Sequence, residues 1–377
     1  MITIILSTLT AILTLWYVGV VLYLRKGWIA LPGHTSSGHP PAVRVSVIIA
    51  ARNEEDKLDG TIRDILSQNF PKDLLEIIVV DDHSTDRTSQ IISSYAEAGV
   101  ILIKLNEDKP LNSYKKKAIS EAIKLATGEL VVTTDADCRM GPLWLRTITD
   151  YYQKGNLKMI SSPVAFFEEK NSFEEMQTLE FLYLIGLGAA TIGHKMPSTC
   201  NGANLAYRRD VFYKVKGFQG IDDLASGDDE LLLHKVASLY PEGIGFCKSR
   251  DAMVYTHAKP DLGAFLQQRR RWASKSTKYK NKGIVALGVS IWLFNLLILV
   301  NTVLGFFDPF FFLVAGLSLL FKCIAELTFL IPMCRFAQRQ DLLWYQPFLT
   351  VAHIFYFVYI GIAGNSGKYN WKDRMVR

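Results

Sequence analysis

Two aspartates lie two positions apart at the end of an apolar run, in the stretch ELVVTTDAD of residues 129–137. The run is rich in β-branched residues and predicts a buried strand that ends near Asp135 and Asp137. Carboxylates this close repel each other unless a positive charge lies between them. Mg²⁺ and Mn²⁺ take oxygen ligands and often share them with substrate phosphates. We therefore expect the pair to hold Mg²⁺ or Mn²⁺ and, through the metal, a diphosphate.

A second group of acids, Asp228, Asp229 and Glu230, comes just before a predicted helix in SGDDELLLHK, residues 226–235. Acids are electrostatically favourable at a helix N-terminus, which is one sufficient reason for their position. The alternative is that one of the carboxylates accepts a proton from an attacking hydroxyl group.

Three consecutive lysines, Lys115, Lys116 and Lys117, stand at the start of another predicted helix, over residues 113–128. A run of lysines usually forms a solvated cationic face. The alternative is that one of them, Lys115, reaches a nucleotide.

The stretch QQRRRW, residues 267–272, comes shortly before a long apolar segment. Tryptophan at the headgroup level and arginine on the cytosolic side are typical of a helix that lies at the membrane interface. The functional alternative places Arg271 on a diphosphate and uses Trp272 as a flat surface for a sugar ring.

The elements that must position these side chains alternate between strands and helices. Apolar runs predict strands at 43–51, 76–82, 100–105 and 129–137, and helices are predicted at 84–99 and 113–128, with Asn53 as the N-cap of an earlier helix. Such alternation indicates a parallel sheet with crossover helices. Ligands bind such sheets at the carboxyl ends of the strands, where the polar residues fall: Arg52, Glu54, Asp81, Asp82, Asp135 and Asp137.

The residues after the first strand argue against two classes of nucleotide-binding protein. They contain neither the Walker loop of nucleoside triphosphatases nor the G-x-G-x-x-G sequence of dinucleotide dehydrogenases.

Long apolar segments lie on both sides of this region. Residues 1–24 carry no charge and are followed by Arg25 and Lys26, which predicts a retained N-terminal transmembrane anchor over 1–26 with its basic end in the cytosol. The uncharged start and late aromatic residues argue against a signal peptide. Further apolar runs predict about three transmembrane helices within 283–365, followed by a basic tail over 366–377.

Two features of the apolar regions each allow two interpretations. Residues 178–193 predict a buried helix, although a helix at the membrane that admits a lipid is the other interpretation. Lys322 and Glu326 lie four residues apart and share a helix face within a predicted span. Charges at membrane depth are candidates for function, but mutual neutralisation is the plainer interpretation and the one we adopt.

Cysteine usage and charge are consistent with a cytosolic domain at a membrane. Five cysteines, an odd number with no C-x-x-C pair, indicate a reduced compartment without a disulfide framework. The densest part of the net charge of +6 is RRRWASKSTKYKNK, residues 269–282, which predicts contact with anionic lipid headgroups. No nucleic-acid partner is expected.

Taken in order, VSVIIAARNEE, VVDDHSTD, DAD, GDD and QRRRW resemble the motifs of the membrane-bound family 2 glycosyltransferases. That group includes cellulose, chitin and hyaluronan synthases. The resemblance covers about residues 43–280 and implies an α/β domain with the GT-A fold, a Rossmann-like and mostly parallel sheet, placed in the cytosol between transmembrane helices. It also implies a nucleotide-diphosphate sugar as donor, commonly a UDP-sugar, and Mg²⁺ or Mn²⁺ as cofactor.

The resemblance further implies a role for each matching residue. The residues expected at the nucleotide sugar are Ala51, Arg52, Glu54, Lys115, Asp135 and, at the uracil, Asp82. Asp137 is expected to hold the metal. The residues expected at the acceptor and the diphosphate are Cys200, Asn201, Gly202, Gln268, Arg271 and Trp272.

The family also implies a general base, which corresponds to Asp229 here. The base motif of the family is usually Glu-Asp, whereas this chain has Asp228-Asp229, so Asp228 remains the alternative. The first motif departs as well, because Ala50 and Ala51 stand where the family usually has a proline nearby. A single displacement by the deprotonated acceptor would invert the anomeric centre.

We therefore expect a hexosyltransferase that acts on a lipid, lipid-linked or glycan acceptor at the cytosolic face of the cell inner membrane. The first alternative is a subunit of a processive polysaccharide synthase, with an oligomer or partner subunit completing the channel. The second is a membrane scaffold that binds a nucleotide without turning it over. A nucleotidyltransferase is the third, although it gives Trp272 no role.

Overall fold

The computed structural model describes residues 1–38, 40–107, 111–224, 226–275, 279, 281–363, 369–371 and 374–376. The chain divides into two compact units. The first consists of Met1–Ile29, Glu169–Gly186 and Lys259–Tyr369, and the second of Ala30–Glu168, Leu187–Ala258 and Asn370–Arg377.

The second unit is built on a sheet with the order β3-β2-β1-β4-β8-β6-β9 among the described residues. Its strands are β1 Val45–Ala51, β2 Leu75–Asp81, β3 Val100–Lys104, β4 Leu130–Asp135, β6 Met159–Ser161, β8 Leu205–Arg208 and β9 Ile244–Phe246. The first four are parallel, and β8 runs antiparallel to both of its neighbours. The predicted α/β class with a mostly parallel sheet is therefore confirmed.

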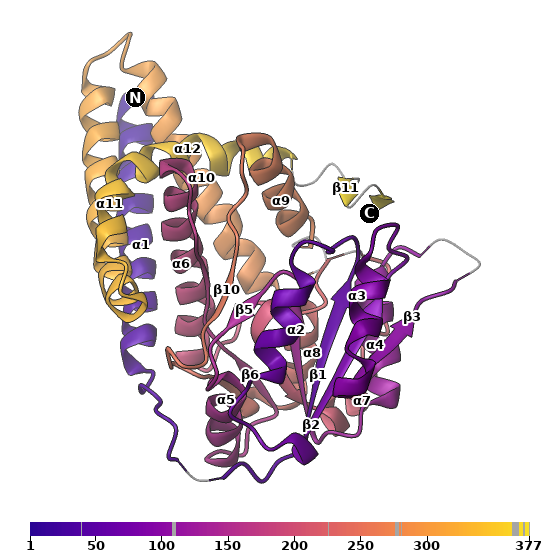
Figure 1. The fold of residues 1–377 in the computed structure, drawn as a ribbon. Coiled ribbons are helices and arrows are strands. Elements are labelled where there is room, and N and C mark those ends of the chain that lie inside the picture. The colour runs from indigo at the N-terminus through magenta and orange to yellow at the C-terminus, as the bar shows by residue number, and fades with distance from the viewer. Residues whose placement is uncertain are drawn as a thin grey trace. The chain divides into compact units, whose positions relative to one another are not determined.

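Helices cover this sheet. They are α2 Leu58–Leu66, α3 Thr88–Ser94, α4 Tyr114–Leu125, α5 Trp144–Gln153, α7 Arg209–Lys214 and α8 Glu230–Leu239. α4 packs on β1 and β2, while α3 packs on β2 and β3 (Figure 1). Val47, Ile48 and Ile49 are buried although they face alternate sides of β1, as expected for a strand with helices on both faces.

A second, smaller sheet has the order β5-β10-β7. Its strands are β5 Arg139–Met140, β7 Val164–Phe166 and β10 Val254–Thr256. β5 follows directly after the predicted metal pair, and β10 pairs with it in antiparallel register, Val254 opposite Met140. This pairing brings the end of β10 to the acids at the end of β4.

The prediction that Asn53 caps a helix is wrong. α2 begins only at Leu58, and Asn53 has a left-handed φ of 48°. Its side-chain Oδ1 instead accepts a hydrogen bond of 2.9 Å from the backbone N–H of Thr85. An asparagine tolerates this conformation because its short polar side chain can bond locally, and here it joins the loop after β1 to the loop after β2.

The glycines at the ends of the predicted helices 84–99 and 113–128 have different roles. Gly99 adopts a left-handed φ of 87° and ends the helical segment that begins with α3, as predicted. α4 ends earlier than predicted, at Leu125. Gly128 lies beyond it against β1, where a Cβ atom would come within 2.5 Å of the Ser46 nitrogen.

The first unit consists of helices. They are α1 Ile2–Ala30, α6 Ser172–Gly193 in its N-terminal part, α9 Leu262–Ser274, α10 Lys282–Leu304, α11 Phe310–Ala337 and α12 Gln346–Ala363. Within the described ranges, five helices are long and apolar enough to cross a membrane: α1, α6, α10, α11 and the η6–α12 segment. Four of these match the predicted spans.

α6 is the fifth candidate span, in the region predicted to be a buried helix. In its most apolar window 61% of the residues are buried, against 22–33% in the other four. Burial inside the protein is therefore a property of α6, and its position in or outside a membrane stays a prediction.

The interpretation of Lys322 and Glu326 as a mutually neutralising pair is confirmed. Their charged atoms lie 2.5 Å apart and both side chains are buried. Glu326 also accepts hydrogen bonds from Tyr17 on α1 and from Gln346 and Thr350 on α12. The carboxylate thus joins three helices of the first unit.

The end of the chain contains two short strands, β11 Tyr369–Trp371 and β12 Arg374–Val376, which pair with each other. The remaining residues of the predicted basic tail, 366–368, 372–373 and 377, lie outside the described residues.

Candidate active site

Three neighbouring parallel strands end at the same edge of the large sheet. Ala51 at the end of β1 is in register with Asp81 of β2, and Ala50 is in register with Asp135 of β4. The polar residues that follow these strands are therefore brought together, as the sequence predicted.

Lys115 joins two acids from distant parts of the sequence. Its ammonium Nζ lies 2.7 Å from Asp135 Oδ1 and 3.1 Å from Asp228 Oδ2. α4 presents Lys115 from its first turn, while Asp135 ends β4 and Asp228 precedes α8. A solvated surface position is thus ruled out for Lys115, while its expected contact with a nucleotide stays a prediction.

The charge of Lys115 is fixed by this setting. Burial lowers the pKa of Lys115, but the carboxylates of Asp135 and Asp228 outweigh burial and hold the pKa above its ordinary value. The ammonium therefore stays protonated across the physiological range and provides one positive charge beside two carboxylates.

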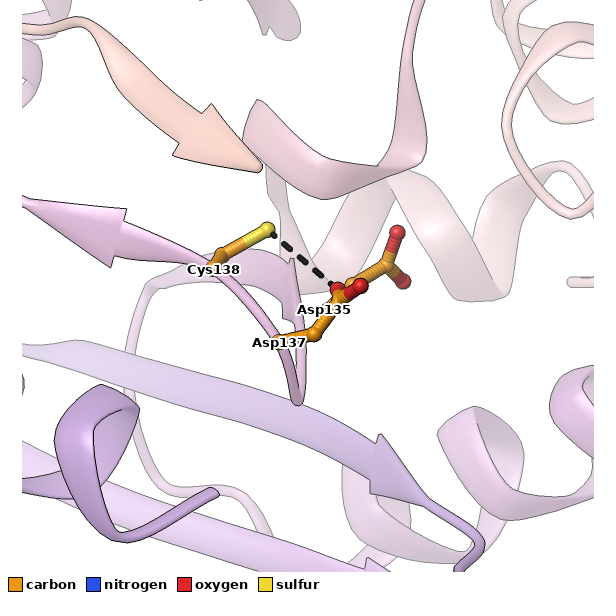
Figure 2. A group of neighbouring side chains, drawn as sticks. All are labelled: Asp135, Asp137 and Cys138. Atoms are coloured by element: carbon orange, nitrogen blue, oxygen red, sulfur yellow. Dashed lines mark hydrogen bonds between the residues drawn. The ribbon is translucent and has the colours of Figure 1, made fainter. Parts of the chain in front are cut away.

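Asp137 lies next to this cluster and forms a possible metal site. The ligand atoms of Asp135, Asp137 and Cys138 lie within 4.8 Å of one another. Figure 2 shows the two carboxylates on the same side of the turn after β4. The Cys138 sulfur lies 4.0 Å from Asp137 Oδ1. Burial raises the pKa of Cys138 well above its ordinary value, so the thiol is neutral and the carboxylates supply the charge.

A neighbour of Asp137 was not predicted from sequence. The Thr256 hydroxyl, at the end of β10, lies 3.4 Å from Asp137 Oδ2. The contact depends on the pairing of β5 with β10, and such short strands give no signal in the sequence from which it could have been found.

Asp229 forms the N-cap of α8. Its Oδ1 accepts a hydrogen bond of 2.6 Å from the N–H of Glu230, and its Oδ2 accepts one of 3.1 Å from the N–H of Gly202. The helix-cap interpretation is therefore confirmed for Asp229. The structure assigns different partners to the two adjacent aspartates, since Asp228 contacts Lys115.

The predicted acceptor-side segment lies against these two aspartates. Asn201 accepts a hydrogen bond from the N–H of Ala203 and so starts a 3₁₀ turn over Gly202–Asn204. A Cβ atom on Gly202 would lie 3.2 Å from Asp228 Oδ2 and 3.3 Å from Asp229 Cβ. Cys200 is half-buried just before this turn.

The residues predicted at the nucleotide form a second group at the ends of β1 and β2. Arg52 donates hydrogen bonds of 2.9 Å to the carbonyls of Asp82 and His83. Asp82 is buried, with Oδ1 3.0 Å from His83 Nδ1, and the N–H of Glu54 donates to the Thr88 hydroxyl. Ala51 is buried at the end of β1. The group fastens two strand-end loops together, and its contact with a nucleotide stays a prediction.

Lys116 was not predicted as a special residue, yet its side chain is 1% exposed. Its Nζ donates hydrogen bonds to the carbonyls of Ile221, Leu224 and Ser226. A signal was available in the sequence, because Ile119 and Ile123 lie three and seven residues later on the same face of α4, and both are buried. Lys117, by contrast, pairs with Glu121 at the surface.

Gln268, Arg271 and Trp272 lie on α9 in the first unit. Arg269, which was not predicted, is the buried arginine there, paired at 2.9 Å with Glu180 of α6. It donates a hydrogen bond to Gln268 and lies 4.4 Å from the ring centre of Trp272. Arg269 therefore fixes two of the three predicted residues, whereas Arg271 is half-buried in the last turn of α9.

Comparison with known proteins finds glycosyltransferases that are similar in sequence to this chain. The family model "Glycosyl transferase family 2" matches residues 46–216. A probable glycosyltransferase of Bacillus subtilis, YdaM, is 29% identical over 240 residues, which are 61% of this chain and 54% of that protein. A beta-monoglucosyldiacylglycerol synthase of Nostoc is 25% identical over 129 residues, 34% of this chain and 28% of that protein. The matched regions thus span about half or less of these relatives.

A solved structure extends the likeness to nearly the whole chain. The mannosyltransferase PcManGT from Pyrobaculum calidifontis, in complex with GDP-Man and Mn²⁺, superposes with a TM-score of 0.59 at 21% identity. The alignment covers 95% of this chain and 98% of that one.

The parallel sheet with acids at its carboxyl edge defines a glycosyltransferase domain of the GT-A fold. The matched segment 46–216 contains β1 to β4, Lys115 and the pair Asp135 and Asp137. Residues 46–216 of the chain are thus a glycosyl transferase family 2 domain.

Proposed function

We propose that the chain is an inverting, metal-dependent glycosyltransferase that moves a hexosyl group from a nucleotide-diphosphate sugar, first of all a UDP-sugar, to an acceptor hydroxyl. The observation that carries the proposal is the cluster in which Lys115 joins Asp135 to Asp228 beside Asp137. It gathers a possible metal ligand, a cation for a nucleotide and a possible proton acceptor at one sheet edge, which is where α/β sheets bind ligands.

A divalent cation fits the residues at the end of β4. Asp137 would be the main ligand, because Asp135 already faces the ammonium of Lys115. Carboxylate oxygens are the donors that Mg²⁺ and Mn²⁺ prefer. When bound, the ion would neutralise the negative charge that grows on the leaving diphosphate. The Mn²⁺ in the structure of the Pyrobaculum mannosyltransferase supports this assignment.

Of the two adjacent aspartates, Asp228 is the better candidate for the proton acceptor. Both carboxylate oxygens of Asp229 accept backbone hydrogen bonds and so hold the start of α8 and Gly202 in place. Asp228 faces Lys115 instead and leaves one carboxylate oxygen outside that ion pair. We assign proton transfer to Asp228 and support of the loop to Asp229, which reverses the preference drawn from the family motif.

The reaction then follows from the arrangement. The acceptor hydroxyl gives its proton to Asp228, and its oxygen attacks the anomeric carbon on the face opposite the diphosphate. The bond from this carbon to the diphosphate oxygen breaks, and the nucleoside diphosphate leaves. The transition state has oxocarbenium character, and one displacement inverts the anomeric centre. Lys115 keeps a positive charge between the nucleotide side and the acceptor side.

A lipid or lipid-linked molecule is the acceptor class that we propose, with a glycan as the next choice. The relative from Nostoc is named for a glucosylated diacylglycerol, and this chain carries five helices of spanning length within its described part. These helices would hold the protein in the cell inner membrane with the sheet domain in the cytosol, where nucleotide sugars are made.

The test uses the full chain in detergent with Mn²⁺ or Mg²⁺. UDP-glucose, UDP-N-acetylglucosamine, UDP-galactose and GDP-mannose are supplied in turn, each with diacylglycerol or a polyprenyl-linked sugar, and the released nucleoside diphosphate is measured. We expect release with one donor only, and a product of opposite anomeric configuration by nuclear magnetic resonance. A long polymer instead of a single transfer would favour the processive synthase.

Matched variants separate catalysis from binding alone. Asp137→Asn and Asp228→Asn should each lower turnover by about 10²-fold or more. Asp73→Asn changes an exposed acid of the same unit and should leave turnover unchanged. A scaffold that binds a nucleotide without turnover would bind UDP yet release nothing in wild type, and this result would reject the proposal.

A further inference from the structure

The residues between α7 and α8 form a loop whose backbone carbonyls point at two lysines. We name residues 217–224 and 226–229 the acid loop, because it ends with Asp228 and Asp229. Lys116 donates to the carbonyls of Ile221 at 2.6 Å, Leu224 at 2.7 Å and Ser226 at 2.8 Å. Lys235 of α8 donates to the carbonyls of two residues at the start of the loop, Gly217 and Gln219.

The hydrogen bonds of Lys116 match its donor capacity. An ammonium has three N–H groups, and here three carbonyls accept them. A buried charge without partners is very unfavourable, and so is a buried carbonyl without a donor. The Lys116 side chain therefore satisfies the backbone carbonyls of this irregular loop, as hydrogen bonds to a neighbouring strand satisfy those of a strand.

The same turn of α4 also binds the acid at the end of the loop. Lys116 binds the loop carbonyls, and the preceding residue, Lys115, binds the Asp228 carboxylate at 3.1 Å. Between these two contacts the chain turns at Gly227, with a left-handed φ of 84° that a side chain would strain. Two adjacent lysines thus fix both the course of the loop and the direction of its acid.

We propose that Lys116 is a positioning residue, which holds the acid loop so that Asp228 faces the reacting groups. This rests on the proposed function, because it assigns Lys116 a task in the transfer reaction. Lys116 would touch neither donor nor acceptor and would act through the loop alone.

Three variants test the proposal in the full chain. Lys116→Met keeps much of the length of the side chain and removes the charge. Lys116→Ala also removes three methylene groups. Lys117→Met is the matched control, since it changes the neighbouring lysine, which pairs with Glu121 and has no hydrogen bond to the acid loop among those of the described residues.

Amide hydrogen exchange over the acid loop is the first measurement. Exchange should be about 10-fold faster or more in Lys116→Met than in Lys117→Met, because the loop loses three charge-assisted hydrogen bonds. Exchange in β1 and β4 should not change, which distinguishes a released loop from an unfolded domain. Equal exchange in the two variants would overturn the proposal.

Steady-state kinetics and binding are the second measurement. Affinity for UDP with Mn²⁺ should stay within about twofold of wild type, while turnover of the sugar nucleotide falls by about 10²-fold, the effect expected from a displaced reacting group. Faster exchange with turnover equal to that of Lys117→Met would also overturn the proposal, since the loop's position would then not matter.

Chemical rescue gives the sharpest readout. Propylammonium replaces the three carbons and the nitrogen that Lys116→Ala lacks, so it should restore turnover in Lys116→Ala. It should not do so in Lys116→Met, whose side chain fills the space. If propylammonium slows the loop exchange of Lys116→Ala to the wild-type rate but does not restore its turnover, the proposal is contradicted.

Failure of the proposed function gives a different result. A wild-type chain that transfers no sugar from any donor contradicts the proposed function and the task of Lys116 in transfer, whatever the loop does. An active wild type with an active Lys116→Met contradicts only the role of Lys116.

Discussion

The backbone N–H of Gly202 donates a hydrogen bond of 3.1 Å to the Asp229 carboxylate. The glycine and the acid come from separate segments, one before β8 and one before α8. This bond, with the N-cap bond of Asp229 to Glu230, places the turn at 202–204 against the two adjacent aspartates.

Gly202→Ala should therefore lower turnover. The new methyl group would lie 3.2 Å from Asp228 Oδ2 and 3.3 Å from Asp229 Cβ, so one acid must move. We expect an activity loss of about 10-fold to 10²-fold, with a loss of about 1–3 kcal/mol in the free energy of unfolding. Gly141→Ala is the control, because no heavy atom lies within 4 Å of its Cβ position. Equal activity of the two variants would show that the close packing at Gly202 is unimportant.

Metal removal should abolish turnover in a way that depends on Asp137. Treatment with a chelator should stop release of nucleoside diphosphate, and added Mn²⁺ or Mg²⁺ should restore it. In Asp137→Asn the neutral amide is a weaker ligand, so we expect the half-saturating Mn²⁺ concentration to rise by about 10-fold or more. Cys138→Ser leaves the carboxylates in place and should change the half-saturating Mn²⁺ concentration little. Full activity of chelated wild type would contradict a metal at this site.

Much of the site could be predicted because the parallel sheet converts strand ends into neighbours. The runs that end at Ala51, Asp81 and Asp135 were recognisable from apolar, β-branched composition, and parallel pairing then forces their carboxyl ends to one edge. The prediction of a charge pair at Lys322 and Glu326 succeeded for a similar reason, since helix geometry alone puts residues four apart on one face.

The parts that could not be predicted depend on contacts between segments without a regular period. Nothing in SGDDELLLHK indicates that Asp228 faces Lys115 while Asp229 caps α8. A small change in the backbone conformation of this loop would be enough to interchange the contacts of the two adjacent aspartates. The burial of Lys116 could have been inferred from Ile119 and Ile123 on its face of α4, but its carbonyl partners lie in an irregular loop. A run of lysines usually indicates a solvated surface, so the sequence provided no reason to expect these carbonyl partners for Lys116.

The pair Lys322 and Glu326 predicts a nonadditive effect on stability. Lys322→Met leaves the buried Glu326 carboxylate without its cation, although Tyr17 still donates to it. Breaking a buried pair typically costs about 3–5 kcal/mol, whereas replacing both partners costs far less. The double variant Lys322→Met with Glu326→Gln should therefore be more stable than Lys322→Met alone. Thermal unfolding in detergent measures this, and additive losses would contradict mutual neutralisation.

The titration of Lys116 should affect stability and turnover in opposite directions as the pH rises. Burial lowers the pKa of Lys116 from its ordinary value to about 8. Between this value and the ordinary pKa of 10.5, the unfolded chain keeps a proton that the folded chain has lost. The contribution of Lys116 to the free energy of unfolding therefore rises with pH over this window, at up to about 1.4 kcal/mol per pH unit, and is lost as the pH falls through about 8.

Turnover should change in the opposite direction. A neutral amine has only two N–H groups, so above a pH of about 8 one of the three loop carbonyls loses its donor and the acid loop loosens. We expect wild-type turnover to fall with an apparent pKa near 8, while the small residual turnover of Lys116→Met shows no such step. The stability of wild type relative to Lys116→Met, measured by thermal unfolding at about pH 7 and about pH 9, should increase at the higher pH. If turnover and relative stability instead fell together, Lys116 would support the fold generally and not the position of Asp228.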